Sequence, residues 1–188
     1  MKKLKKIFKK SYPELFHLNC DYQLNPFLSH LDWLMIHFHL NRLTNKFEIK
    51  IHALVVMNTH IHMLIHSLNK KENYFTSEFL QCIHSTSLDQ SLLEPIINLS
   101  QYLNTYKYIY RNPVEVGLVK KCQDYYLSSL HSMLGKSDTQ YNQVIDPLSI
   151  IQNPIQVLRW LNQPYENKFF HSKSVLTNWR TESISDSF

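Results

Sequence analysis

The stretch "ALVVMNTHIHMLIHS", residues 53–67, predicts the centre of the fold. It contains two apolar segments with Asn58 and Thr59 between them, which we interpret as two strands joined by a tight turn. The first strand becomes wholly apolar towards the turn, as a central strand would. His60 and His62 follow the turn. Because successive strand side chains alternate between faces, these two imidazoles point the same way.

The histidine pair has two interpretations. The Cα atoms of His60 and His62 should lie roughly 7 Å apart in a strand, so both rings can converge on one divalent ion. The alternative is a pair of partly buried histidines that hydrogen-bond to their neighbours. Histidine-triad nucleotide hydrolases are disfavoured because Leu64 occupies the place of their third histidine. Amidohydrolase-type sites are disfavoured because they need a far longer barrel chain.

The rest of the chain adds strands and helices by its periodicity and capping residues. The first strand of the hairpin begins at residue 47 and spans 47–57. Two further strands are predicted at 14–23 and 91–97, the last at a sheet edge because it contains Pro95. Helices are predicted at 26–43, with Ser29 as N-cap, and at 76–87, with Thr76 or Ser77 as cap. A third helix is predicted at 98–111, with Asn98 or Ser100 as cap and the Asn112–Pro113 pair as its end. Two more are predicted at 124–136, closing at Gly135, and within 154–168. This order predicts an α+β fold, with a small antiparallel sheet and helices packed on one face.

Length, charge and cysteines limit the class of protein. A chain of 188 residues with a net charge of +5 and eleven histidines favours one domain and an anionic partner. Three scattered cysteines without a C-x-x-C pair fit a reducing compartment and small, partly buried side chains. No apolar run approaches a membrane span, and no apolar core follows the basic start. We therefore expect a cytoplasmic protein that does not bind a membrane.

The first ten residues, "MKKLKKIFKK", include six lysines. The run fits either a solvated terminus or a basic arm that contacts phosphate. The lysines are Lys2, Lys3, Lys5, Lys6, Lys9 and Lys10.

The predicted helix at 98–111 carries three alternate tyrosines. Tyr106 and Tyr110 share one helix face, whereas Tyr108 shares another with Asn112, one turn further on. A phenol and an amide oxygen therefore lie together. A phenol with its pKa near 10 is a poor nucleophile, but a neighbouring metal ion can polarise the bond that it attacks.

Two segments, taken in their order along the chain, resemble the single-tyrosine HUH transposases of the REP-associated branch. They are "VVMNTHIHMLI" and "YKYIYRNPVEVGLVKKCQDYYLSSLHSMLG". Those proteins commonly carry "VVMPNHVHLLI", "YIHLNPVRAGLV" and "DYPWSSYRAYLG". The resemblance covers about residues 13–135, without a middle segment. It implies a ferredoxin-like sheet and a domain at 13–136, between a basic arm at 1–12 and a partly irregular C-terminal extension at 137–188.

The resemblance also implies a DNA strand-transfer site. His60, His62 and Asn112 would bind a divalent metal, Mg²⁺ or Mn²⁺, and Tyr108 would attack a scissile phosphate to form a 5′-phosphotyrosine link. Single-stranded or hairpin DNA would be the partner of a monomer or homodimer. The lysines of the arm and Arg111 would contact this DNA.

The sequence departs from the family pattern in the middle. The usual Pro-Asn before the first histidine is Asn58–Thr59, the usual Pro-Trp is Tyr126–Leu127, and no Arg or Lys lies between Lys71 and Lys107. A basic segment of the family that commonly helps to hold DNA is therefore missing. Two alternatives follow: a decayed or domesticated DNA-binding protein without cleavage, and a small metal-dependent hydrolase that uses the histidine pair on another substrate.

Overall fold

The centre of the protein is a four-stranded sheet in which all neighbouring strands are antiparallel. In the computed structural model, which describes residues 8, 13–21, 30–83, 91–136 and 144–164, the strands lie in the order β2-β3-β1-β4. Their bounds are β1 (Leu15–Asp21), β2 (Ile49–Val56), β3 (His60–Ser67) and β4 (Ser91–Pro95). The hairpin predicted from the opening stretch is the β2–β3 pair, and the strand with Pro95 is an edge strand, as predicted. The expectation that β2 is a central strand was wrong: it lies at the other edge, and its apolar run reflects burial on both faces.

Two helices connect strands that are not neighbours in the sheet. Helix α2 (His30–Phe47) leads from β1 to β2, and α3 (Glu72–Cys82) leads from β3 to β4. In each case another strand lies between the two that are joined. This β-α-β-β-α-β order is ferredoxin-like. The predicted α+β class with a ferredoxin-like antiparallel sheet is confirmed.

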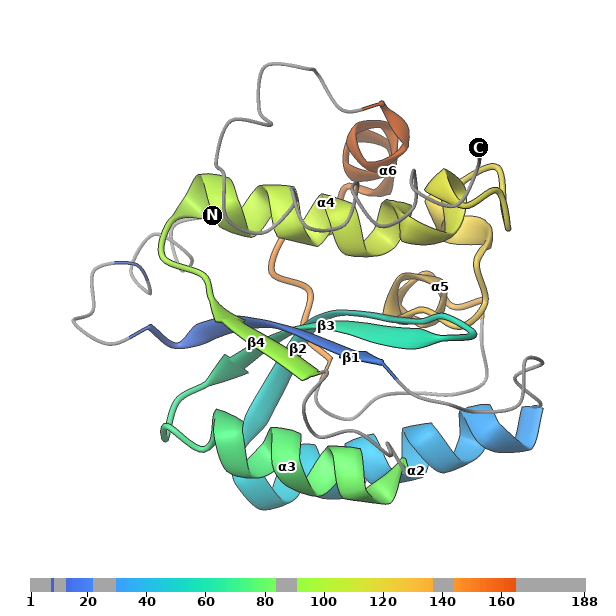
Figure 1. Ribbon diagram of the computed structural model, residues 1–188. Coiled ribbons are helices and arrows are strands. Elements are labelled where there is room, and N and C mark those ends of the chain that lie inside the picture. The colour runs from blue at the N-terminus through green and yellow to red at the C-terminus, as the bar shows by residue number, and fades with distance from the viewer. Residues whose placement is uncertain (1–7, 9–12, 22–29, 84–90, 137–143, 165–188) are drawn as a thin grey trace, which may run out of the picture.

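Helices cover both faces of the sheet (Figure 1). Helices α2 and α3 pack together on one face, while α4 (Leu99–Glu115) and α5 (Ser129–Met133) lie on the other, with α6 (Pro154–Asn162) outside α4. The prediction of helices on one face therefore holds for α2 and α3 but was incomplete. The physical reason is that β2 is buried on both faces, with Lys50 as its single half-buried residue, so a second helical layer is needed.

Several helix boundaries differ from the sequence prediction. Helix α5 covers only Ser129–Met133 of the predicted 124–136, and α2 runs on to Phe47, which was predicted to begin the next strand. Helix α3 begins at Glu72, before the predicted caps, and this places Phe75 one turn from Phe79, with their stacked ring centroids 6.0 Å apart in the core. Helix α4 begins after Asn98, which caps it, but continues through Pro113 to Glu115. A proline in the last turn removes only one backbone donor, so the Asn112–Pro113 pair did not end the helix. The predicted cap Ser29 lies outside the described residues.

The outer edge of β2 is covered by the segment that contains "DYYLSS". The amide of Val56 donates to the Leu127 carbonyl at 2.9 Å, and the Tyr125 hydroxyl donates to the Val56 carbonyl at 2.8 Å. The amide of Leu54 donates to Ser129 Oγ at 2.9 Å. An uncovered edge would offer these groups to another chain. The motif is thus a structural edge cover.

Two further predictions concern the burial of the cysteines and the absence of a membrane-spanning segment. Cys20 and Cys122 are buried free thiols and Cys82 is half-buried, as predicted. Of the helices in the described part of the chain, none is long and apolar enough to cross a membrane.

Candidate functional site

The site forms where α4 crosses over β3. The Asn112 side-chain Nδ2 donates to His62 Nε2 at 3.0 Å, although the two residues are 50 positions apart. The same Nδ2 lies 3.3 Å from the Tyr108 hydroxyl, to which it donates. Both His62 and Asn112 are buried. The two halves of the site that the sequence predicted therefore meet within one chain.

His60 lies beside His62 at the start of β3, and their ring centroids are 4.6 Å apart. Its Nδ1 is 2.8 Å from the hydroxyl of Thr59 in the preceding turn. Burial lowers the pKa of His60, while the charge of Asp21 on the paired strand and the interaction with the Asn112 side chain partly oppose this. The pKa of His62 is lowered well below its usual value by burial and by the neighbouring imidazoles. Both rings are thus neutral near pH 7, as metal ligation requires.

Tyr108 is half-buried, with its ring centroid 5.2 Å from that of His62. Burial raises the pKa of Tyr108 to about 12, and the hydrogen bond from Asn112 acts in the opposite direction. The phenol is therefore protonated at neutral pH. To act as a nucleophile, this phenol would need an added positive charge nearby or a base that takes its proton.

The donor set fits a divalent cation. Of the described residues, no three His, Cys, Asp or Glu side chains are grouped so that they hold a metal, so two imidazoles need a ligand of another type. The Asn112 amide could supply it: its nitrogen faces His62 here, and a half-turn of the amide would present the oxygen instead. Two imidazole nitrogens and one amide oxygen suit a metal of the Mn²⁺ type.

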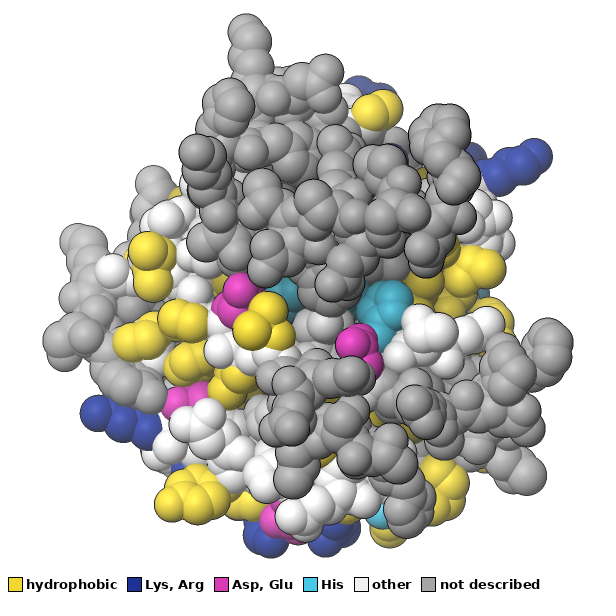
Figure 2. Space-filling view, in the orientation of Figure 1, with side chains coloured by type: hydrophobic (Ala, Val, Ile, Leu, Met, Phe, Trp, Pro, Cys, Tyr) yellow, Lys and Arg dark blue, Asp and Glu magenta, His cyan; other side chains and the backbone are white. Residues whose placement is uncertain are grey.

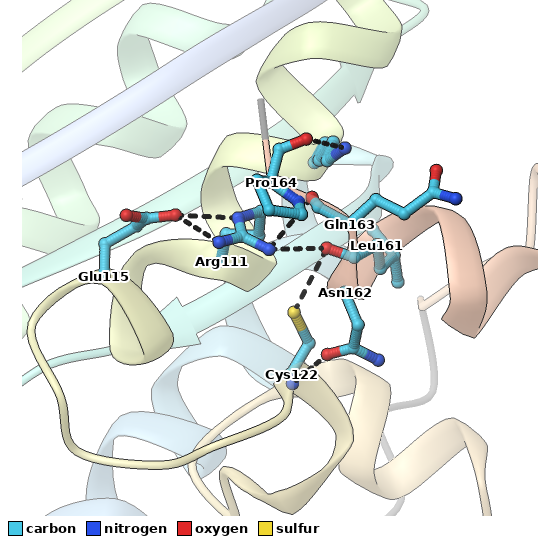
Figure 3. Close-up of polar contacts among 8 residues, drawn as sticks. Arg111, Glu115, Cys122, Leu161, Asn162, Gln163 and Pro164 are labelled. Carbon is cyan, nitrogen blue, oxygen red and sulfur yellow. Dashed lines mark hydrogen bonds and ion pairs between the residues drawn. The ribbon is translucent and has the colours of Figure 1, made fainter. Parts of the chain in front are cut away.

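Arg111 lies apart from this cluster, although it is adjacent to Asn112 in sequence. Its guanidinium is buried and donates to the Glu115 carboxylate and to the carbonyls of Leu161 and Gln163 at the end of α6 (Figure 3). These contacts complement the negative end of the α6 helix. The structure thus places Arg111 in an internal contact, and its predicted role in DNA binding finds no support in this geometry.

The other predicted residues divide into two groups. Tyr106 and Tyr110 are fully buried, and the Tyr110 hydroxyl lies 2.8 Å from Ser129 Oγ, which agrees with their expected packing role. The lysines predicted to contact DNA lie outside the described residues: Lys2, Lys3, Lys5, Lys6, Lys9 and Lys10. Within that arm, Phe8 is described, and its ring packs edge-on against Tyr102 of α4 at 6.3 Å.

Sequence reasoning missed His17 of β1. Its Nε2 lies 3.3 Å from His62 Nδ1, and the two rings stack with centroids 5.4 Å apart. Burial lowers the pKa of His17 to about 4. The available signal was the alternation in "FHLNCD", which puts His17 and Asn19 on one face of the strand. Asn19 is paired with His62 in the β1–β3 register. In the space-filling view, histidine and acidic side chains lie close together near the middle of the visible face (Figure 2).

Comparisons with known proteins agree with the fold. No protein-family model and no curated protein matches the chain. A solved structure, described as a REP-associated tyrosine transposase bound to a REP hairpin, matches with a TM-score of 0.53 and 17% identity. The match covers 74% of this chain and 98% of the transposase chain. The protein therefore has the fold of a REP-associated tyrosine transposase.

Proposed function

We propose that the protein is a metal-dependent single-tyrosine DNA transposase of the HUH type, which cleaves and rejoins single-stranded or hairpin DNA. The observation that carries this proposal is that the Asn112 amide lies within hydrogen-bonding distance of both His62 and Tyr108. The shared fold supports it, because the solved relative was captured with a REP hairpin.

In the proposed reaction, the oxygen of Tyr108 attacks the phosphorus of a scissile phosphodiester. The bond from phosphorus to the 3′-oxygen breaks, the 3′-oxygen leaves as a hydroxyl after it takes up a proton, and the 5′-phosphate remains on the tyrosine. Attack on this linkage by a 3′-hydroxyl reverses the exchange and rejoins DNA. Asn112 orients the phenol by donating to its oxygen.

His60, His62 and Asn112 would hold the divalent ion, Mg²⁺ or Mn²⁺. When bound, the ion would neutralise charge on the scissile phosphate and orient it. This matters here because burial raises the pKa of Tyr108 to about 12, and added positive charge favours the phenolate.

The lysine-rich arm at 1–12 would provide the sequence-independent part of DNA binding. Phe8 contacts Tyr102 of α4, the helix that carries Tyr108. Lysine–phosphate contacts of this kind make the affinity for DNA depend steeply on salt concentration.

We also propose that the transposase unit spans residues 13–136 and that residues 137–188 form a C-terminal extension.

A second candidate is a DNA-binding protein of the same fold that has lost cleavage. The lack of Arg and Lys between Lys71 and Lys107 favours it, since fewer cations are available to hold the strand. It predicts the same binding without a covalent product.

The two candidates are separated by a covalent-adduct assay. The full chain is incubated with REP-type hairpin DNA labelled at its 3′ end, the end that stays on the protein in the proposed reaction, and Mn²⁺, and the products are resolved on a denaturing gel. The first proposal predicts a labelled protein adduct that the Tyr108→Phe variant does not form. Tyr126→Phe is the matched control, because Tyr126 is exposed and lies outside the site. Binding without adduct favours the second candidate, and an adduct that survives Tyr108→Phe overturns the choice of nucleophile.

A further inference from the structure

A row of polar side chains crosses three strands of the sheet and ends at the proposed metal site. His62 on β3, His17 on β1 and Glu94 on β4 share the sheet face that α4 covers, because His17 contacts His62 and is the register partner of Glu94. Paired residues of antiparallel strands place their Cβ atoms about 5 Å apart on one face.

The hydrogen bonds determine which ring nitrogens carry protons. Because Asn112 Nδ2 donates to His62 Nε2, that nitrogen has its lone pair free, and His62 must carry its proton on Nδ1. Nδ1 of His62 then donates to Nε2 of His17 at 3.3 Å. His17 in turn carries its proton on Nδ1. The same assignment is the one in which Nε2 of His62 can bind a metal.

The last proton of this row has no partner in the structure. Nδ1 of His17 is a buried atom without a hydrogen bond, and so is Oε2 of Glu94. A buried donor and a buried acceptor left unpaired are each costly. The Asn19 side-chain oxygen is also unpaired. However, Asn19 lies two residues further along β1, which separates its Cα atom from that of His17 by about 7 Å. Glu94, directly opposite His17 on β4, is therefore the nearer acceptor.

We propose that Glu94 accepts a hydrogen bond from His17, directly or through one water, and that Glu94 and His17 together position His62 for metal binding. This inference rests on the proposed function, since it assigns two positioning residues to the same metal site. A metal-bound histidine commonly donates its second nitrogen to such a partner, which fixes the ring and its protonated nitrogen. Here the partner is a second histidine, and the carboxylate lies one strand further away.

The test measures Mn²⁺ affinity by calorimetry on the full chain, without DNA. His17→Leu is expected to weaken binding by 10- to 100-fold, as for other partners of metal-bound histidines, and Glu94→Leu by a smaller factor. The decisive comparison is the double variant. Because Glu94 acts through His17, adding Glu94→Leu to His17→Leu should cause no further loss. Equal losses in both backgrounds would overturn the inference.

Two further variants guard against a general disturbance of the strands. Leu92→Ala changes the neighbouring, partly exposed position on the same face of β4 and should leave the affinity unchanged; a loss equal to that of Glu94→Leu would overturn the inference. If His17→Leu does not fold, His17→Met replaces it, since methionine fills the apolar space and has no N–H to donate to Glu94. In that background Glu94→Leu should have no effect, and a persisting effect contradicts the relay.

A spectroscopic readout separates this inference from the proposed function. Nitrogen-15 shifts of the His62 ring, recorded without metal, should report one form protonated at Nδ1 in the wild type and a mixture of two forms in Glu94→Leu. An unchanged spectrum would overturn the inference even if Mn²⁺ binds. If the wild type does not bind Mn²⁺ but the shifts change as expected, the proposed metal site fails and the relay stands.

Discussion

The Nδ2 atom of Asn112 lies within hydrogen-bonding distance of both His62 and Tyr108, at 3.0 Å from Nε2 and 3.3 Å from the hydroxyl. The Asn112 amide thus connects α4, which carries Tyr108, to β3, which carries His60 and His62. A change at this position affects the proposed metal ligands and the proposed nucleophile together.

Asn112→Leu removes this connection while keeping the side-chain volume similar. We expect adduct formation to fall by at least about tenfold, because a ligand oxygen and the donor to Tyr108 are both lost. Asn112→Asp keeps an oxygen ligand and should retain Mn²⁺ binding. Calorimetry and the adduct assay measure the two effects. If Asn112→Leu binds Mn²⁺ as the wild type does, Asn112 is not a ligand.

Folding stability should decline as the pH falls from about 6.5 to 4. Burial lowers the pKa of His17 to about 4 and that of His52 to about 3. Below about pH 6.5 the unfolded chain takes up protons that these buried rings do not, so acid favours unfolding. For His17 alone the shift corresponds to roughly 3 kcal/mol.

Urea unfolding at pH 7 and pH 4.5 measures this loss. His17→Gln removes one of the titrating rings, so its stability should depend less on pH than that of the wild type. Equal losses for both proteins would show that His17 does not titrate as expected.

Ser129→Ala should destabilise the fold without a change in the site. The buried Ser129 Oγ accepts from the Leu54 amide at 2.9 Å and lies 2.8 Å from the Tyr110 hydroxyl. Alanine leaves both groups unpaired, which costs about 2 kcal/mol. Thermal unfolding compares this variant with Lys121→Ala, at an exposed position of the neighbouring segment. A stability equal to the wild type would refute the role of Ser129 as edge cover.

Arg111→Ala should release the end of α6. The variant loses the bonds to the carbonyls of Leu161 and Gln163 and the ion pair with Glu115. Bonds made by a charged group contribute about 2 kcal/mol. Hydrogen exchange should therefore speed up over residues 154–162. Arg159→Ala, at an exposed position of the same helix, is the control. Slow exchange in Arg111→Ala would show that packing alone holds α6.

The lysine run should govern the salt dependence of DNA binding. Replacement of its six lysines by glutamine removes six positive charges. We expect weaker binding and a shallower slope of log K against log salt, by up to about one for each lysine that contacts a phosphate. Fluorescence anisotropy with a labelled hairpin measures both. An unchanged slope would mean that the arm does not contact DNA.

The sequence predicted the site best where the periodicity of a single strand or helix determines which side chains lie on the same face. Strand alternation predicted the shared face of His60 and His62, and helical spacing predicted that of Tyr108 and Asn112. The contact between these pairs depends on how α4 lies across β3, which no local pattern encodes. His17 was missed for the same reason, because its role depends on the β1–β3 register. The internal contacts of Arg111 were not predicted, because charge in a sequence does not reveal that α6 packs against this residue; its role in DNA binding stays a prediction.

Helix α4 carries two functions on adjacent positions. Tyr108 and Asn112 face the sheet, whereas Lys107 and Arg111 bind the end of α6 through the carbonyls of Pro164, Leu161 and Gln163. A rotation of α4 that swung the tyrosine outward would pull these cations off their acceptors. These contacts hold the backbone at the proposed nucleophile in place. Under the proposed function, a DNA strand would therefore be accommodated by rotation of the Tyr108 side chain and not by movement of the helix.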